Sequence, residues 1–481
     1  SGIIASVITM DHYKAHFTNK STIQGAVVST FNGGCFFGAL GAGWYATAPV
    51  LLTFTASQEN RLNDRLGRKR TIQIGCVFSI WGGAMQSGAS NVATLLVGRI
   101  IGGIAIGILS MTVPLYNTEI APPENRGLLV GLTQQMLGIG FIVANWVGYG
   151  CQFIGSDASW RLPLGLQLVP ASLLLLGIQF LPYSPRWLLE VDRDDEAKAV
   201  VYKLHGKGNE IAAELEYQEM HDTIKAEARV KTRSLRTLVS TVPMAKRLFV
   251  AVGVQVFTQF TGINVINYFG PTMYRSLGIT GHKSLLVQGI YGAVGPIANL
   301  FFIVFLLDRV GRKKPLVFGA GSFVCTFSIL AAIVATNPVD SPLSNQTAQR
   351  AGIAMIFLTS VMFSLSFGPV SWVLASEVFP THARALGTMV ATCCNWAFNT
   401  MIGQVAPIGM DKVGWKFYML FVALNLVDMI IIAIFFPETK GKTLEEMNEV
   451  FGDHITVEPK NNSSHSIQKV EKAGDAKTEA V

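Results

Sequence analysis

The chain has 481 residues, of which 50% are hydrophobic and 14% are charged, and its mean hydropathy is +0.40. Soluble globular proteins carry about 25% charged residues, so this composition excludes an ordinary soluble fold. The net charge of +7 does not indicate nucleic-acid binding, because the cations lie in short loops and in the tail, which is typical of membrane topology. The six cysteines lack metal or redox spacing, so we interpret them as free thiols and expect no metal and no cofactor.

The first 181 residues contain one short apolar run and five long ones. Residues 1–9 are too few to cross ~30 Å at about 1.5 Å per residue, and we interpret them as the end of a first helix that starts before Ser1. A polar loop covers 11–20. We expect residues 1–181 to form an N-terminal membrane bundle, with long apolar segments at about 22–43, 71–90, 92–115, 127–150 and 162–181.

A polar region separates this bundle from a second one. Residues 182–246 include the helix-forming runs Asp194–Leu204 and Asn209–Val230, which predict a cytoplasmic linker of amphipathic helices. Residues 437–481 form a polar tail that we expect to be cytoplasmic and mostly disordered. Between them we expect a C-terminal membrane bundle at 247–436, with apolar segments at about 248–270, 284–307, 315–336, 351–375, 385–408 and 414–436.

The loops indicate an orientation. Those at 64–70, 122–126, 308–314 and 381–384 are basic, as is the linker, and cytoplasmic loops carry the excess of Lys and Arg. The other loops hold two possible glycosylation acceptors, Asn19-Lys20-Ser21 and Asn345-Gln346-Thr347. We therefore predict a multi-pass protein of the plasma membrane, embedded in the lipid bilayer, with its tail in the cytoplasm.

Three short motifs occur once in each half. The basic loop Asp64–Arg70 returns as Asp308–Lys314, 308 − 64 = 244 positions later. Glu119-x6-Arg126 returns as Glu377-x6-Arg384, 377 − 119 = 258 positions later. A Pro-containing motif also closes each half, at 181–186 and at 436–440. We infer two copies of one membrane unit, with a substrate path between them near the midplane.

These motifs resemble the major facilitator superfamily and, within it, the sugar porters of fungal type. The resemblance rests on the Asp-Arg-x-Gly-Arg loops and on four runs, and it extends from Gly2 to about Gly452. It implies an all-α membrane protein with two six-helix bundles, the first helix mostly missing, joined by a cytoplasmic helical linker. It also implies a carrier of monosaccharides, hexose-like and coupled to protons, and not an enzyme. The runs begin at Pro114-Leu115-Tyr116, Pro182, Gly262-Ile263-Asn264 and Pro437-Glu438-Thr439.

Two places depart from the family pattern. The opening helix, which carries an acidic residue in proton-coupled members, should precede Ser1. In addition, Tyr45–Arg61 separates Trp44 from Leu62 although the family has no counterpart for these residues. Their possible codons allow a splice donor and an acceptor, so one hypothesis is a retained intron. The alternative is a lineage-specific extension.

Binding a polyol in a dry cavity requires neutral hydrogen-bonding groups and aromatic walls, and buried amides meet the first need without a buried charge. The resemblance adds that Gln134 faces the sugar, that Gln259 and Asn264 match a seventh-helix Gln-x4-Asn pattern, and that Tyr268 matches the first of a tyrosine pair. The alternative for a buried amide is a bridge between helices, which we favour for Asn145, Asn399 and Asn425. The candidate substrate-binding residues are Gln134, Gln259, Asn264, Tyr268, Asn299, Trp372, Asn395 and Trp396.

Charges at the cytoplasmic helix ends are candidates for gating ion pairs or for topology anchors. Arg99 differs from them because it lies within an apolar span, where a lone cation is costly and usually functional. The resemblance pairs it with the first-helix acid. Asp428 is a second charge within a span, and we assign it no role. The candidate gating residues are Asp64, Arg65, Arg68, Arg99, Glu119, Arg126, Arg186, Arg309, Arg312, Glu377 and Arg384.

Two function classes stay open. The favoured one is a carrier that moves a monosaccharide, as a proton symporter or as a facilitative uniporter. The other is a sugar sensor of the same fold, but such sensors have long tails and this chain ends soon after Pro437. The sequence shows no nucleophile–base pair, nucleotide loop or metal cluster, which argues against an enzyme.

Overall fold

The computed structural model describes residues 2–17, 20–44, 62–120, 126–205, 210–230, 235–305, 307–338, 345–440, 447 and 450–452. Within these ranges the regular secondary structure is α-helix with short 3-10 turns, and there is no strand. Residues 1–440 form one compact unit, and 441–481 are a separate one. The hypothesis of an inserted segment at Tyr45–Arg61 concerns residues outside the described ranges.

Each apolar segment that the sequence predicted in the first half corresponds to one or more helices. The predicted segment at 162–181 is not one uninterrupted helix, because two turn residues separate α7 from α8 and a 3-10 turn ends it. The helices are α1 (Gly2–Val7), α2 (Asp11–Phe17), α3 (Ser21–Trp44), α4 (Leu62–Ser87), α5 (Val92–Ile120), α6 (Arg126–Cys151), α7 (Ala158–Gly165) and α8 (Leu168–Gly177).

The linker folds into three short helices with a small apolar core of their own. They are α9 (Pro185–Glu190), α10 (Asp194–His205) and α11 (Glu210–Val230), and the last two confirm the predicted helical runs to within one residue at each end. Ser184 caps α9 by accepting a hydrogen bond from the Trp187 N–H, and Pro185 occupies the first turn, where a missing N–H is harmless. The core contains Trp187, Leu188, Ala197, Val201 and Met220.

In the second half two predicted spans are broken into pairs of helices. Segment 248–270 breaks at Gly262, whose φ of +77° is left-handed and whose added Cβ would lie 2.7 Å from the Phe327 ring. Only glycine fits both conditions. Segment 351–375 breaks at Leu365–Ser366. The helices are α12 (Val242–Phe260), α13 (Ile263–Arg275), α14 (His282–Phe305), α15 (Leu307–Val310), α16 (Lys313–Thr336), α17 (Gln346–Ser364), α18 (Phe367–Glu377), α19 (Thr381–Val413) and α20 (Lys416–Phe435).

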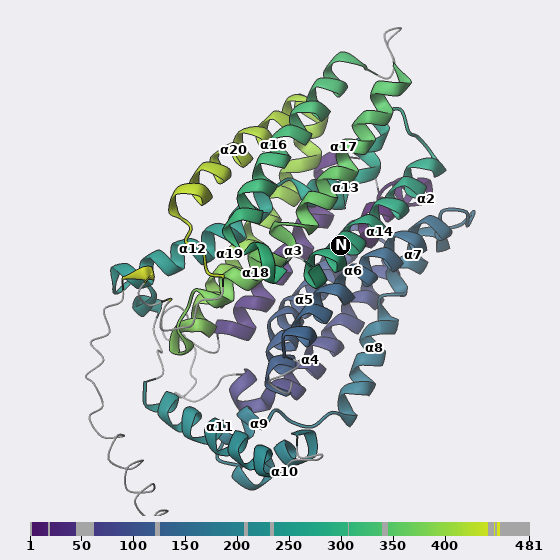
Figure 1. Cartoon of the computed structure of the whole chain (residues 1–481). Coiled ribbons are helices and arrows are strands. Elements are labelled where there is room, and N and C mark those ends of the chain that lie inside the picture. Colours follow the sequence, from purple (N-terminus) through teal and green to yellow (C-terminus); the bar gives the residue numbers. More distant parts are fainter. Residues whose placement is uncertain are drawn as a thin grey trace, which may run out of the picture. The chain divides into compact units, whose positions relative to one another are not determined.

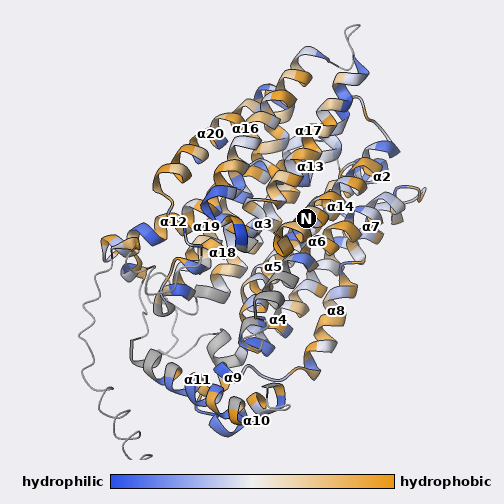
Figure 2. Ribbon diagram, viewed as in Figure 1, coloured by the Kyte–Doolittle hydropathy of each residue, from blue (hydrophilic) through white to orange (hydrophobic). Residues whose placement is uncertain are grey.

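The bundle has the surface of a membrane protein. Among the described residues, seven helical segments are long and apolar enough to cross a membrane, and α3, α4, α6 and α19 occupy the four remaining predicted spans. Large apolar side chains lie on the outside, such as Phe180 (88% exposed) and Ile297 (67%). Figure 2 shows that hydrophobic residues predominate along the helices of the bundle and that polar residues are frequent on the linker helices. So large an apolar surface suits hydrocarbon and not water.

Helices from the two halves pack against each other along the bundle. α3 lies against α19, α6 against α14, and α1 against α13. In Figure 1 the linker helices α9–α11 gather at one end of the bundle, which we name the linker end, and α2 lies toward the opposite end, which we name the loop end. α3 begins at the loop end and α19 finishes there. The first residues of α3 therefore meet the last residues of α19 at that end.

Glycines allow α3 and α5 to approach unusually closely. Each helix carries two glycines four positions apart, Gly34 with Gly38 and Gly103 with Gly107. A Cβ atom added at Gly103 would collide with the backbone carbonyl of Phe31, and the other three positions face backbone atoms in the same way. Helices in lipid are held by such close packing, because no hydrophobic effect drives them together there.

We predict that Gly103→Val prevents α3 and α5 from docking and sharply lowers the yield of folded protein, because backbone cannot move aside as a flexible side chain does. The measurement is the monomer peak in size-exclusion chromatography and the melting temperature in detergent. Gly140→Val on α6, where an added Cβ meets nothing within 4 Å, is the matched control. Equal yields for both variants would contradict the prediction.

Candidate functional site

The break between α12 and α13 brings two predicted binding residues together. Gln259 is 2% exposed near the end of α12, and Asn264 is half-buried at the start of α13. Asn264 Nδ2 donates to Gln259 Oε1 over 2.6 Å, across the turn that Gly262 makes. This pair has further donors and an acceptor with which to meet the hydroxyl groups of a ligand.

A second amide pair lies one turn earlier on α12. Asn395 Nδ2 on α19 donates to Gln255 Oε1 over 2.6 Å, and Gln255 Nε2 donates to the Ser371 carbonyl on α18 over 3.4 Å. Gln255 is fully buried, and it was missed in the sequence. The signal was present, because Gln255 and Gln259 are four residues apart and therefore lie on one helix face.

Three polar side chains join the two halves. Tyr268 Oη on α13 donates to Asn399 Oδ1 on α19 over 2.9 Å. Asn32 Nδ2 on α3 donates to the same oxygen over 2.8 Å. All three side chains are at most 5% exposed. Asn399 thus bridges helices, as predicted for it, and it also fixes the hydroxyl of a predicted binding residue. Asn32 was not identified from the sequence.

The α6–α14 contact contributes another amide pair. Asn299 Nδ2 donates to Gln135 Oε1 over 3.4 Å, from one half to the other. The helices come close there because Gly138 lies under Pro296, whose ring an added Cβ would meet at 2.8 Å. The side chain of Gln134, the predicted residue on this helix, is outside the described part of the structure.

The two predicted aromatic residues differ in exposure. Trp396 on α19 is half-buried, and its indole N–H has no hydrogen-bond partner among the described residues. Trp372 on α18 is 39% exposed. A buried indole N–H normally finds a partner, so the Trp396 donor is available to a ligand.

Arg99 is 3% exposed within α5, and its described partners are neutral. Its Nε donates to the Val27 carbonyl over 2.9 Å, its Nη1 donates to Gln86 Oε1 over 3.5 Å, and its guanidinium lies 4.3 Å from the centre of the Phe31 ring. Backbone, amide and ring together solvate the cation. Asp428 on α20 is also buried, and its Oδ2 lacks a partner among the described residues.

At the linker end the first basic loop contacts two glutamates, one in its own half and one in the linker. Arg68 Nη2 lies 2.8 Å from Glu119 Oε1 on α5, and Nη1 lies 3.1 Å from Glu190 Oε2 on α9. Gly67 has a φ of +79°, and an added Cβ would lie 3.0 Å from the Trp187 indole. The arginine therefore fastens a span and the linker to the same loop.

The second basic loop repeats this pairing. Arg312 Nη2 lies 3.1 Å from Glu377 Oε1 at the end of α18, and Thr439 Oγ1 donates to Glu377 Oε2 over 3.1 Å. Gly311, with a φ of +87°, lies against the Glu438 carboxylate. In both halves, the arginine after the loop glycine binds the glutamate of the second repeated motif.

Backbone N–H groups surround Glu438. Burial tends to raise the pKa of its carboxyl, but four backbone N–H donors outweigh burial and lower the pKa below its ordinary value. The donors, at 2.8 to 3.1 Å, are the N–H groups of Arg312, Lys313, Thr439 and Lys440.

The other predicted gating residues are not drawn into these pairs by any described contact. Arg309 is exposed, and its carbonyl accepts from Lys440 Nζ over 2.6 Å. Arg186 is half-buried, and Arg384 Nη2 donates to the Phe379 carbonyl over 3.5 Å. The side chains of Asp64, Arg65 and Arg126 lie outside the described part of the structure.

Comparison with known families agrees with this geometry. The family model described as "Sugar (and other) transporter" matches residues 1–451. This chain belongs to the sugar transporter family. Members of the family are transporters and not enzymes, and the chain is a multi-pass membrane protein with the major facilitator fold.

Individual members of the sugar transporter family resemble the chain over nearly its full length. The MFS-type transporter criB of Aspergillus cristatus is 37% identical, with 99% of this chain and 95% of criB covered. The high-affinity glucose transporter of Kluyveromyces lactis is 31% identical, with 94% and 82% covered. The xylose transporter XylE of E. coli, in a partially occluded inward open conformation, has a TM-score of 0.73 and 24% identity, with 92% and 96% covered.

We predict that Glu438→Gln lowers the melting temperature at neutral pH, because the neutral amide binds the four N–H donors less strongly than the carboxylate does. The lowered pKa means that Glu438 stabilises the fold while ionised. That stability is present above the ordinary glutamate value of about 4.3 and is lost as the pH falls through the lower value in the folded state.

The difference in melting temperature between wild type and Glu438→Gln should therefore shrink as the pH falls below that range. Glu219→Gln, an exposed position on α11, is the control. A difference that stays constant with pH would contradict the assignment.

Proposed function

We propose that the chain is a secondary active carrier that moves a monosaccharide of hexose type across a membrane, together with a proton, by alternating access. The observation that carries the proposal is the cluster of uncharged amides on α12, α13 and α19. In the described structure Asn264 donates one hydrogen bond to Gln259. A sugar hydroxyl can replace one bond of such a pair at little net free energy, which suits a carrier that must also release its ligand.

The proposed binding set keeps the residues that the sequence identified and adds Gln255. Gln259, Asn264 and Asn395 supply donors and acceptors. The indole N–H of Trp396, which has no partner among the residues that the structure describes, supplies one more donor. The hexose preference is supported by the glucose transporter of K. lactis, whereas XylE carries xylose, a pentose. The quinate permease of Neurospora terricola, 31% identical, indicates that relatives also carry hydroxylated acids. The full set is Gln134, Gln255, Gln259, Asn264, Tyr268, Asn299, Trp372, Asn395 and Trp396.

We propose that residues 1–181 and 247–436 are the two moving halves, that 182–246 is a cytoplasmic linker, and that the linker end faces the cytoplasm of a plasma-membrane protein. Two hydrogen bonds support a state closed at the loop end: Ser29 Oγ donates to Gln404 Oε1 over 2.8 Å, and Ser21 Oγ donates to Asp411 Oδ2 over 3.2 Å. At the linker end, Arg68 pairs with Glu119 and Arg312 pairs with Glu377, each within one half, and Arg68 also pairs with Glu190 of the linker.

The ion pairs at the linker end make each half a rigid body in this proposal. Arg68 with Glu119 and Arg312 with Glu377 hold the helix ends of each half while the halves rock about the α3–α19 contact. When the loop end opens, the helix ends of the two halves approach each other at the linker end. The arginines of each half then exchange their glutamate partners for those of the other half. That exchange is the proposed gating step.

Proton coupling is supported by Arg99. A cation buried within a span is expensive, and it is kept where it serves transport. Its described partners are all neutral, so the arginine can respond to a carboxylate that gains or loses a proton. XylE, described as a proton:xylose symporter, shares the fold. The alternative is a facilitative uniporter.

The test is uptake of radiolabelled sugars by a transporter-deficient cell that expresses the chain, at two external pH values. We expect hexose uptake that is faster at the lower pH, because protons then flow inward with the sugar. Uptake independent of pH would identify a uniporter. Failure to take up any sugar despite delivery to the membrane would refute the carrier.

We predict that Asn264→Ala raises the KM for the hexose by about tenfold, the effect of one lost hydrogen bond of ~1.4 kcal/mol, without reducing delivery to the membrane. Gln218→Ala, at an exposed amide on α11, is the control for expression and delivery. A KM equal to that of wild type would remove Asn264 from the site.

A further inference from the structure

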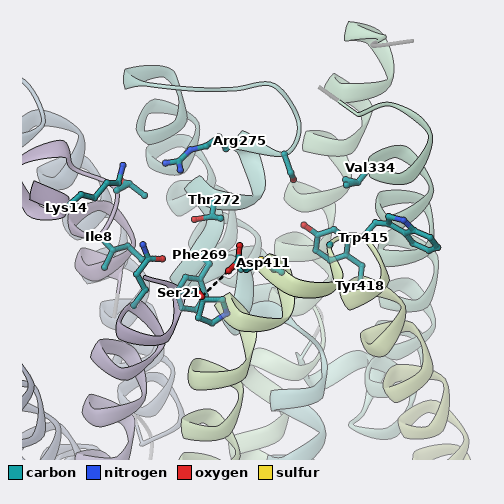
Figure 3. Close-up of a pocket in the computed structure, with 16 residues that line it drawn as sticks. Ile8, Lys14, Ser21, Phe269, Thr272, Arg275, Val334, Asp411, Trp415 and Tyr418 are labelled. Atoms are coloured by element: carbon teal, nitrogen blue, oxygen red, sulfur yellow. Dashed lines mark hydrogen bonds between the residues drawn. The ribbon is translucent and has the colours of Figure 1, made fainter. Parts of the chain in front are cut away.

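A cavity lies at the loop end, and none of the residues of the amide cluster lines it. Its volume is about 300 Å³, near the lower limit for small-molecule sites. Both halves line it: α2 and α3 from the first, and α13, α19 and α20 from the second. Figure 3 shows the side chains that matter here. They are Lys14, Ser21, Arg275, Asp411, Trp415 and Tyr418.

Two cations, one from each half, occupy one side of this cavity. In Figure 3 the Arg275 guanidinium, at the end of α13, extends toward the Lys14 ammonium on α2. Burial and the charge of Arg275 lower the pKa of Lys14, against the weaker opposing effect of Asp11. Asp11 lies 3.6 Å from Lys14 but its side chain is fully exposed, and such surface pairs contribute little. Two like charges held together favour an anion between them.

The rest of the cavity suits a hydroxylated, partly apolar body. Asp411 Oδ2 accepts from Ser21 Oγ over 3.2 Å, and its carboxylate has further acceptor positions for ligand hydroxyls. Trp415 and Tyr418 supply aromatic surface on the far side of the carboxylate from Lys14, as Figure 3 shows. Aromatic faces of this kind pack against the C–H face of a saturated ring.

We propose that this cavity binds a monocarboxylic acid of sugar size that carries hydroxyl groups, with its carboxylate between Lys14 and Arg275. The hydroxyl groups meet Asp411 and Ser21, and the ring lies toward Trp415 and Tyr418. This site is separate from the transport site, so the inference goes beyond the proposed function. Neutral sugars lack the carboxylate and bind here weakly.

Occupation of the site opposes opening at the loop end. A carboxylate held by Lys14 and Arg275 links the first half to the second, in parallel with the Ser21–Asp411 hydrogen bond that already does so. A ligand that binds one arrangement of the halves more tightly shifts the equilibrium toward it. The acid therefore slows transport of a neutral sugar without competing for the amide cluster.

The experiment uses the purified full chain in lipid nanodiscs, with glucuronate and glucose as probes, because these differ mainly by the carboxylate. We expect calorimetry to show glucuronate binding that weakens with added salt. Arg275→Gln and Lys14→Gln should each weaken it by about tenfold, the effect of one charge-assisted hydrogen bond. Lys283→Gln removes the same charge from an exposed position at the start of α14, outside the cavity lining, and should leave binding unchanged.

Uptake separates the two sites. External glucuronate should slow hexose uptake by wild type as a noncompetitive inhibitor, and the same inhibition of Arg275→Gln should require about tenfold more glucuronate. Glucuronate should still bind Asn264→Ala. Binding that is lost in Asn264→Ala, or that is equal in wild type and in both charge variants, would overturn the inference. If the inference were overturned but hexose uptake persisted, the carrier proposal would still stand. If hexose uptake were absent but glucuronate still bound through Lys14 and Arg275, only the carrier proposal would be refuted.

Discussion

The structure depends on one ion pair that occurs twice, between the arginine after each loop glycine and the glutamate of the next motif. Arg68 is 6% exposed and Glu119 is 7% exposed, so both groups are held away from water, where each alone would be costly. The pair therefore forms only when the helix ends are correctly placed. Arg312 and Glu377 form the corresponding pair in the second half, where the two side chains are more exposed, at 13% and 35%. In the proposed mechanism, these pairs let each half move as a unit.

The chain segment that follows the last span of each half reinforces this constraint, by different chemistry in the two halves. In the first half, Glu190 of the linker helix α9 adds a second carboxylate to Arg68. In the second half, Glu438 binds backbone N–H groups at the start of α16 instead of the arginine side chain. An N–H array at a helix start is itself a site for a negative charge. A glutamate that follows the last span of each half thus reaches the same mechanical result, by an ion pair in one case and by helix capping in the other.

Neutral polar side chains and most charged side chains occupy different levels along the bundle. The amide cluster at α12, α13 and α19 contains hydrogen-bonding groups without net charge, which a dry site tolerates. The ion pairs of the repeated motifs lie at the linker end, and Lys14 and Arg275 lie at the loop end. Arg99 and Asp428 are exceptions among the described spans, and backbone, amide and aromatic groups surround Arg99. A neutral sugar and a hydroxylated acid would accordingly be recognised at different depths.

The sequence by itself determined the spans, the linker helices and the repeated motifs, because apolar length and helical periodicity are local properties of the chain. It also identified Gln259, Asn264 and Asn395, since a polar residue inside an apolar run is conspicuous. Tertiary structure decided the rest. The Gly262 break, the partnership of Gln255 with Asn395 and the joining of Asn32, Asn399 and Tyr268 all depend on which helix faces meet. Lys14 and Arg275 are 261 positions apart (275 − 14), and only the packing of the two halves brings them to one cavity.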